Sequence, residues 1–433
     1  MTARVRNDSL TLDALWKATL LVSLPFGALS FALPIYGRML KASALEIGAL
    51  FSAVALVPVI IRPFLGRILD RWGRRPFFLA GLASYTVSMV LICVAKSMLV
   101  LGIGRFVQGI GQALLWLSAY AIVADVSQAD RRGRGFGAID EAMNRGSLIG
   151  VMPGLVGIGL MQFAGLAWGT VWPVLFGGYA VAAFCGLLLG VRHVEETRPA
   201  VKEKVAPTRP ITLQIATLMG IVFVTGASTA MVWPIIVIFL QDRLRAGAIM
   251  MAFAYLPAAL ILSFLPSRLG RITDRFGRKP MMAIGLVIGA AASALMPQLS
   301  SIVLLAILWG VDSLGFTASS PAERAFVADI AGSDARGVSY GLYTFAYFLG
   351  TAIGPLAGGW LYDNLGRSFP FYANSVMLLL AAALVMTLLR EPVVLGRTPS
   401  PGTLRVSRLF HRQTGQPPRR DRHRTPGTGA GSQ

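Results

Sequence analysis

The residues of this sequence that could do chemistry are acidic side chains within long apolar segments. Asp312, Asp140 and Glu323 each lie in such a segment. A charge in hydrocarbon costs a few kcal/mol or more, so residues of this kind are candidates for function or for buried ion pairs. A carboxyl group at mid-membrane readily holds a proton, because desolvation disfavours its charged form. The acids are therefore candidates for proton carriers or for members of buried ion pairs. The sequence contains no nucleotide-binding loop, zinc-ligand cluster or catalytic triad that would predict an enzyme.

Asp312 is the leading candidate for a proton carrier. It precedes Asp329, at the end of the same segment, by 17 residues, which a helix covers in about 25 Å. Asp312 is then near the middle of a membrane, and the alternative is a permanently ionised structural pair. Glu141 and Arg145 are four residues apart and can pair on one helix face. The complete set of proton-coupling candidates is Asp312, Asp140, Glu141, Glu323 and Arg105.

Long apolar segments must position these side chains. Hydrophobic residues make up 55% of the 433 residues and charged residues 14%, whereas soluble globular proteins carry about 25% charged residues. About twenty apolar residues cross the hydrocarbon core as a helix, which satisfies its own backbone hydrogen bonds. The sequence predicts an all-α membrane protein with twelve transmembrane helices in two six-helix halves. The spans lie near residues 14–36, 45–68, 77–95, 98–125, 136–161, 168–191, 211–240, 247–268, 281–297, 301–329, 338–362 and 369–390.

Basic residues in the short loops set the orientation. The loops after the even-numbered spans, with the central linker, hold 18 Lys and Arg, and the loops after the odd-numbered spans hold six. We therefore expect a multi-pass protein of the plasma (inner) membrane with both termini in the cytoplasm. The predicted domains are a cytoplasmic N-terminus, a first half, a cytoplasmic linker, a second half and a disordered basic cytoplasmic tail, at residues 1–13, 14–191, 192–210, 211–390 and 391–433.

An internal repeat relates the two halves. Residues 66–76 read GRILDRWGRRP and residues 270–280 read GRITDRFGRKP, with eight of eleven residues identical at an offset of 204. One offset over several separate stretches indicates a tandem duplication, and many transporters bind substrate between such repeats near the bilayer midplane. The same offset relates Gly146, Gly150 and Gly154 to Gly350, Gly354 and Gly358.

Both copies of this loop resemble the hallmark cytoplasmic motif of the major facilitator superfamily, G-x-x-x-D-R-x-G-R-R/K-P. Residues 101–113, LGIGRFVQGIGQA, are similar to that superfamily's fourth-helix motif, in which an arginine precedes a glycine-rich stretch. The resemblance covers roughly residues 10–390 and implies a twelve-helix transporter with alternating access. The family associates the arginine of the fourth-helix motif, here Arg105, with proton-coupled function; the alternative is a packing hydrogen bond to nearby carbonyl groups.

The loop motif also has a physical interpretation of its own. Its two glycines permit a tight turn, and Asp70, at the end of a helix, could lie against the positive N-terminus of a helix from the other half. The resemblance implies a latch that forms when the cytoplasmic side is closed, with the ion pairs Arg74–Asp125 and Arg278–Asp329. The alternative is a basic loop that only sets topology. The motif residues are Gly66, Asp70, Arg71, Gly73 and Arg74, and in the second half Gly270, Asp274, Arg275, Gly277 and Arg278.

The first, fourth, seventh and tenth helices line the cavity in this family, and here they carry aromatic side chains. Such a lining favours an amphipathic organic compound over a sugar phosphate or a multiply charged anion. The substrate-cavity candidates are Phe26, Phe31, Trp116, Tyr120, Trp233, Trp309 and Phe316. The glycines from Gly341 to Gly359 resemble the family's antiporter motif, but drug–proton antiporters carry that motif on the fifth helix. The motif therefore leaves the direction of transport open.

The leading hypothesis is proton-coupled efflux of a small organic or drug-like compound, as in the drug–proton antiporters that the sequence resembles. The alternatives are an uptake permease for a sugar or other metabolite, and a membrane receptor or scaffold that does not transport. We expect a monomer in a lipid bilayer that uses the proton gradient, with no cofactor, metal or nucleic acid. Nine of the 40 basic residues lie from Arg390 onward, and we expect them to contact anionic lipid.

Overall fold

The structure is a computed structural model, and it describes residues 2–127, 132–197, 213–331 and 336–389. Within these ranges a few residues, including Asp70, Asp274 and Asp329, are described by their backbone only. The predicted tail and most of the predicted linker lie outside the described residues.

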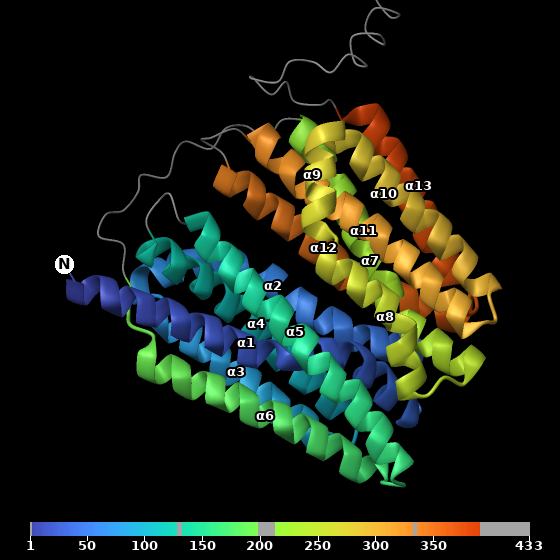
Figure 1. Cartoon of the computed structure of the whole chain (residues 1–433), viewed down its shortest axis with the longest axis horizontal. Coiled ribbons are helices and arrows are strands. Elements are labelled where there is room, and N and C mark those ends of the chain that lie inside the picture. Colours follow the sequence, from blue (N-terminus) through green and yellow to red (C-terminus); the bar gives the residue numbers. More distant parts are fainter. Residues whose placement is uncertain (1, 128–131, 198–212, 332–335, 390–433) are drawn as a thin grey trace, which may run out of the picture. The chain divides into compact units, whose positions relative to one another are not determined.

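Six long helices make up the first half of the chain (Figure 1). They are α1 (Thr2–Met39), α2 (Ala44–Trp72), α3 (Arg75–Cys93), α4 (Met98–Val126), α5 (Arg132–Phe163) and α6 (Trp168–His193). The six helices predicted for this half are confirmed, although α1 begins well before residue 14. α2 extends beyond the predicted end at residue 68, so that Asp70 and Arg71 lie in its last turn.

The second half contains the six predicted spans, but one of them is broken. Its helices are α7 (Leu213–Leu244), α8 (Ala248–Phe264), α9 (Pro266–Phe276), α10 (Arg278–Leu295), the short 3-10 helix η1 (Met296–Gln298), α11 (Ile302–Ala331), α12 (Arg336–Asn364) and α13 (Phe369–Leu388). The prediction of a single helix over residues 247–268 is wrong, because α8 ends at Phe264 and a new helix, α9, starts at Pro266. Proline lacks the N–H that would continue the hydrogen-bond ladder of α8.

The tight turn of the loop motif depends on one glycine in each half. Gly73 and Gly277 have φ angles of 97° and 100°, a region that is costly for residues with a Cβ atom. Gly66 and Gly270 instead lie inside α2 and α9. The expectation that both glycines of each motif form the turn is therefore wrong for these two, because the helix extends through them.

Corresponding helices of the two halves pack on each other in the same way. α1 packs on α5 as α7 packs on α12, and α3 packs on α4 and α6 as α10 packs on α11 and α13. Small residues at the crossings allow the backbones to approach closely. A Cβ atom on Gly150 would meet the carbonyl of Leu24, and one on Gly354 would meet the carbonyl of Ala227. These glycines of the repeat are packing positions.

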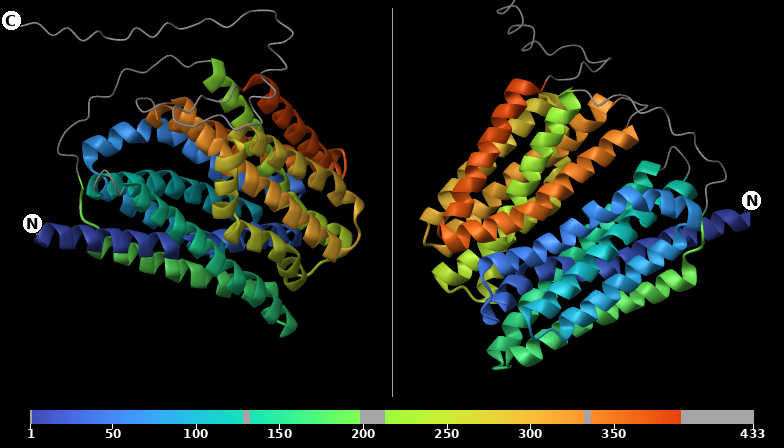
Figure 2. Two further views of the ribbon diagram at one scale, coloured as in Figure 1. Left: turned by 45° about the horizontal axis from the view of Figure 1, so that its top comes forward. Right: turned by 180° about the vertical axis from the view of Figure 1, so that it is seen from behind.

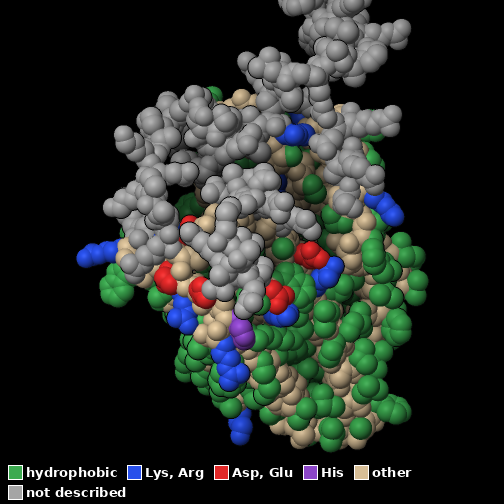
Figure 3. Space-filling view, turned by 60° about the vertical axis from the view of Figure 1, so that its left-hand side comes forward, with side chains coloured by type: hydrophobic (Ala, Val, Ile, Leu, Met, Phe, Trp, Pro, Cys, Tyr) green, Lys and Arg blue, Asp and Glu red, His purple; other side chains and the backbone are tan. Residues whose placement is uncertain are grey.

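The outer surface fits a lipid environment. Nine of the described helices are long and apolar enough to cross a membrane, while α8 has only 17 residues. Large apolar side chains such as Phe64, Phe163 and Phe253 are exposed, and extended apolar surface of this kind is rare on soluble monomers. In Figure 3 the acidic side chains lie in a band across the middle of the view, several with basic side chains beside them, and hydrophobic side chains cover much of the lower surface.

The helix bundle has two ends, an N-terminal face and an opposite face. The N-terminal face is the end at which α1 begins and at which α2 ends. The opposite face is the end that carries the short loops 39–44, 244–248 and 364–369 (Figure 2). At the opposite face, hydrogen bonds and an ion pair join the two halves. They involve Arg38, Ala44 and Leu45 of the first half and Asp242 and Asp363 of the second.

Candidate functional site

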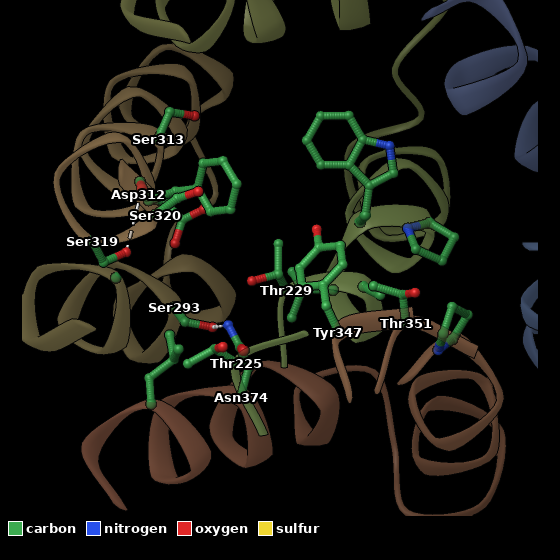
Figure 4. A pocket seen from close by; sticks show the side chains of 18 of the residues that line it. Thr225, Thr229, Ser293, Asp312, Ser313, Ser319, Ser320, Tyr347, Thr351 and Asn374 are labelled. Atoms are coloured by element: carbon green, nitrogen blue, oxygen red, sulfur yellow. Dashed lines mark hydrogen bonds between the residues drawn. The ribbon is translucent and has the colours of Figure 1, made fainter. Parts of the chain in front are cut away.

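A cavity of about 490 Å³ lies between the helices and is lined by both halves (Figure 4). Its size lies within the range of small-molecule sites. The first half contributes residues of α2 and α4, such as Phe51 and Arg105, and the second half contributes most of the wall. The polar part of the wall contains Thr225, Thr229, Ser293, Asp312, Ser313, Ser319, Ser320, Glu323, Tyr347, Thr351 and Asn374.

Asp312 lines this cavity from α11. The carboxylate packs beside Gly289 of α10, where an added Cβ atom would lie 3.5 Å from Asp312 Oδ1. Among the described residues no ion pair includes Asp312. The alternative for Asp312, a permanently ionised side chain in a structural ion pair, is therefore not seen among the described residues.

Glu323 lines the same cavity, three helical turns further along α11. Its side chain is 6% exposed, and it accepts a hydrogen bond of 3.5 Å from the Thr225 hydroxyl. The repeat offset relates Asp312 and Glu323 to the uncharged Gln108 and Ala119. The cavity is thus acidic on the second half only, and no three acidic, His or Cys side chains of the described residues gather into a metal site.

Arg105 is held by the first half. Its Nε donates to the carbonyl oxygen of Leu50 on α2 at 3.0 Å, and one terminal nitrogen donates to Gln108 Oε1 at 2.5 Å. The packing hydrogen bond that was the alternative for this residue is present. Arg105 lines the cavity with Asp312 but forms no ion pair with it among the described contacts.

A second cavity, of about 980 Å³, lies beside the first and shares Trp233 and Phe316 with it. Asp140 lines it and accepts a hydrogen bond from the Tyr120 hydroxyl. Glu141 also lines it and forms the ion pair with Arg145 that their spacing predicts, at 2.5 Å. Both side chains of this pair are largely exposed, so the pair contributes little to stability.

Aromatic side chains from both halves meet between the two cavities. The rings of Phe31 on α1 and Tyr255 on α8 are 4.9 Å apart, and those of Tyr255 and Trp309 are 5.3 Å apart. Trp233 contacts Tyr255 and Trp309 edge to face. Tilted and edge-to-face arrangements are the preferred ones for aromatic pairs.

Four of the seven aromatic candidates line a cavity, namely Phe31, Trp233, Trp309 and Phe316. Phe26, Trp116 and Tyr120 line neither of these two cavities, so their assignment to the substrate cavity stays a prediction. Phe26 packs on Tyr85 inside the first half, and Trp116 packs on Tyr120. A helix places only part of its circumference toward the cavity, and membership of α1 or α4 does not identify that part.

Sequence reasoning missed Tyr255 and Phe51, which lie on α8 and α2 and line the cavities. The signal was present in the repeat, because the offset of 204 places these two aromatic residues at equivalent positions. Tyr347 and Phe348 of α12 also line the first cavity, and no pattern in the sequence singled them out.

The loop motif of the first half forms its predicted ion pair. Arg74 Nε lies 3.0 Å from Asp125 Oδ2, and the Arg74 side chain is buried. Both partners belong to the first half, so their pairing does not require the halves to meet. The expectation that this contact exists only in one conformation is therefore wrong. In the second half Arg278 donates to the carbonyl of Ala325 at 2.6 Å. The side chain of its predicted partner Asp329 lies outside the described residues, as do those of the motif aspartates Asp70 and Asp274.

The sequence profile of the Major Facilitator Superfamily matches residues 15–217 and 218–422, one match for each half. The chain belongs to the major facilitator superfamily. The second match extends into the tail, beyond residue 390, where the resemblance was expected to end.

This transporter has relatives with different names. It is 24% identical over 387 residues to Multidrug resistance protein 1 of Bacillus subtilis (strain 168), covering 88% of this chain and 97% of that protein. It is 28% identical over 344 residues to the vesicular acetylcholine transporter of Homo sapiens, covering 74% of this chain and 61% of that protein. A crystal structure of a bacterial homologue of the human lysosomal transporter Spinster, in an inward-facing and unoccupied conformation, superposes with a TM-score of 0.70 at 16% identity, over 88% of this chain and 96% of that one. The likeness to that structure supports the fold.

Proposed function

We propose that this transporter exports a small organic cation across the plasma membrane in exchange for protons. The observation that carries the proposal is the pair of cavity acids, Asp312 and Glu323, which lie beside aromatic side chains and in no ion pair of the described residues. A carboxylate in such a place can hold a proton or neutralise a bound cation. Two carboxylates in one cavity allow both tasks in a single transport cycle.

The aromatic lining supports a cationic and amphipathic substrate. Organic cations are attracted to the faces of Trp and Tyr rings, and Trp233, Trp309 and Tyr347 line the cavity that contains both acids. One relative is named for acetylcholine, a quaternary ammonium compound, and another for multidrug resistance. The first name agrees with a cationic substrate, and the second agrees with a drug-like one.

The direction of transport is proposed from the loops and from the relatives. The excess of basic residues in the loops after the even-numbered spans favours a cytoplasmic N-terminal face. The contacts between the halves at the opposite face then lie on the external side of the membrane. Export agrees with the name of the Bacillus relative.

Everted membrane vesicles test this function. With an imposed pH gradient, acid inside, vesicles that contain the protein should accumulate tetraphenylphosphonium, and vesicles without the protein should not. Tetraphenylborate, an anion of the same shape, is the matched control and should not accumulate. Uptake only into right-side-out vesicles would instead indicate a permease, and protein-dependent accumulation of tetraphenylborate would refute a cation site.

A further inference from the structure

We infer that the opposite face is closed by an asymmetric clasp, in which Asp363 of the second half caps helix α2 of the first. The clasp consists of Asp363 with the start of α2, together with the ion pair Arg38–Asp242. Among the residues whose side chains the structure describes, no carboxylate takes the equivalent place between α5 and α8. The inference rests on the proposed function in one respect, namely that alternating access requires this face to open.

The clasp satisfies backbone donors at the start of α2. The N–H groups of Ala44 and Leu45 donate to the two carboxylate oxygens of Asp363, at 3.1 and 2.8 Å. The remaining donors of this turn are satisfied locally, since Glu46 N–H donates to Ser43 Oγ and Ser43 N–H donates to the Glu46 carboxylate. A helix leaves its first N–H groups without internal partners and is positive at this end. Asp363, on a helix of the second half, therefore satisfies the N–H groups of Ala44 and Leu45 at the start of α2.

Two glycines allow α2 and α12 to approach closely at this contact. A Cβ atom on Gly359, one turn before Asp363, would meet the backbone of Ala44 and Leu45, and one on Gly48 would meet the carbonyl of Pro355. α2 and α12 therefore meet backbone to backbone where they cross. This close approach brings the Asp363 carboxylate within reach of the N–H groups.

The ion pair of the clasp joins equivalent positions of the repeat. Arg38 and Asp242 are 204 residues apart, which is the offset of the duplication. Equivalent residues can touch only where they lie close to the axis that relates the two halves. Identical residues at such a place could not form an ion pair, but here the first half has Arg38 and the second half has Asp242. Tyr362 donates from its hydroxyl to Asp242 Oδ2 at 3.0 Å, so the pair is also tied to α12.

The other side of the interface lacks such a cap. The repeat offset relates Asp363 to Gly159 on α5, and Leu45 to Ile249 on α8. Gly159 lies against the Ile249 side chain, so these elements meet through apolar contact. Among the described residues no side chain caps α8, which begins after Gly247. Opening this face must therefore break hydrogen bonds between α2 and α12, but only apolar contacts between α5 and α8.

Spin-label distances across the opposite face test the clasp. Labels replace Lys96 and Ser300, exposed residues of equivalent loops in the two halves, in the full chain with Cys93→Ser and Cys185→Ser. Asp363→Asn should shift the equilibrium toward the longer, open distance by about two- to fivefold, the effect of one charge at an exposed helix N-terminus. Glu46→Gln is the matched control, because it removes a charge from the same helix end but no contact between the halves, and it should leave the distances unchanged.

Further variants keep the test decisive. Asp363→Glu retains the charge and should restore the closed distance, and Arg38→Gln should shift the distances in the same direction as Asp363→Asn. Unchanged distances in both Asp363→Asn and Arg38→Gln, or an equal shift in Glu46→Gln, would overturn the clasp. The measurement needs no substrate, so a shift in Asp363→Asn with no export of tetraphenylphosphonium by the unmodified protein would reject the proposed function and leave the clasp intact.

Discussion

Asp312 combines two features that a proton carrier needs. It lines a cavity that both halves enclose, and among the described residues it forms no ion pair that would hold it ionised. Glu323 shares the cavity and can still neutralise a cationic substrate when Asp312 is neutral. The two acids can therefore be separated by substitution.

Replacing Asp312 by Asn should abolish accumulation driven by the pH gradient and retain exchange of tetraphenylphosphonium between equal concentrations. The amide keeps the size of the side chain but cannot take up a proton. Both rates are measured in reconstituted vesicles, for the variant and for the unmodified protein. If the Asp312 variant still concentrates the probe, the carrier is another acid, and Asp140 and Glu323 are the next to test.

The aromatic side chains separate into cavity and packing residues, and a pair of variants tests this division. Trp233→Leu should weaken binding of tetraphenylphosphonium about fivefold, because an aromatic contact contributes about 1 kcal/mol beyond its buried area. Phe26→Leu should leave the affinity unchanged, since Phe26 packs on Tyr85 and lines neither cavity. Calorimetric titration in detergent measures both affinities, and equal losses would contradict the assignment.

At the scale of the helices, the glycines of the repeat set how closely α7 and α12 pack. Gly354→Ala should lower the free energy of unfolding by about 1–3 kcal/mol, because its Cβ atom would meet the backbone of Ala227 and Met231. Gly341→Ala, on the same helix but with open space around it, should be neutral or slightly stabilising. Thermal unfolding in detergent compares them, and the same melting temperature for both would argue against close packing at Gly354.

The loop motif is expected to act as a latch through its aspartates. Asp70→Asn and Asp274→Asn should favour the state open at the N-terminal face and slow transport, because each removes a charge that can stabilise a helix N-terminus of the other half. A cysteine at Ser320, which lines both cavities, reports this opening through its reaction with a membrane-impermeant thiol reagent. Wild-type reactivity and transport in both variants would reduce the motif to a role in topology.

For the whole molecule, the distribution of basic residues predicts that both ends of the chain are cytoplasmic. A fluorescent protein that folds only in the cytoplasm should fluoresce when it is fused before Thr2 or after Gln433. Alkaline phosphatase, which is active only outside the cytoplasm, should be inactive at both places. Phosphatase activity at either end would reverse the orientation, and with it the direction proposed for export.

The sequence by itself determined the helices, the duplication and the family. A span must bury about twenty apolar residues and satisfy its own backbone, so membrane helices can be found from composition along the chain alone. The repeat offset of 204 also relates Gly150 to Gly354, and the structure shows both at equivalent packing positions. The repeat does not predict the helix break before Pro266. The residue at the equivalent position of the first half is Arg62, which lies within the unbroken helix α2.

Only the tertiary structure decided which faces of those helices form the site. In a membrane the lipid-facing and the buried faces of a helix are both apolar, so hydrophobic periodicity does not give the rotation of a helix about its axis. Periodicity therefore did not separate Phe26 from a cavity residue, and only the repeat, which relates Tyr255 to Phe51, could have drawn attention to Tyr255. The contact of Asp363 with Ala44 and Leu45 joins residues more than 300 positions apart, and it depends on how the two halves meet rather than on any local pattern.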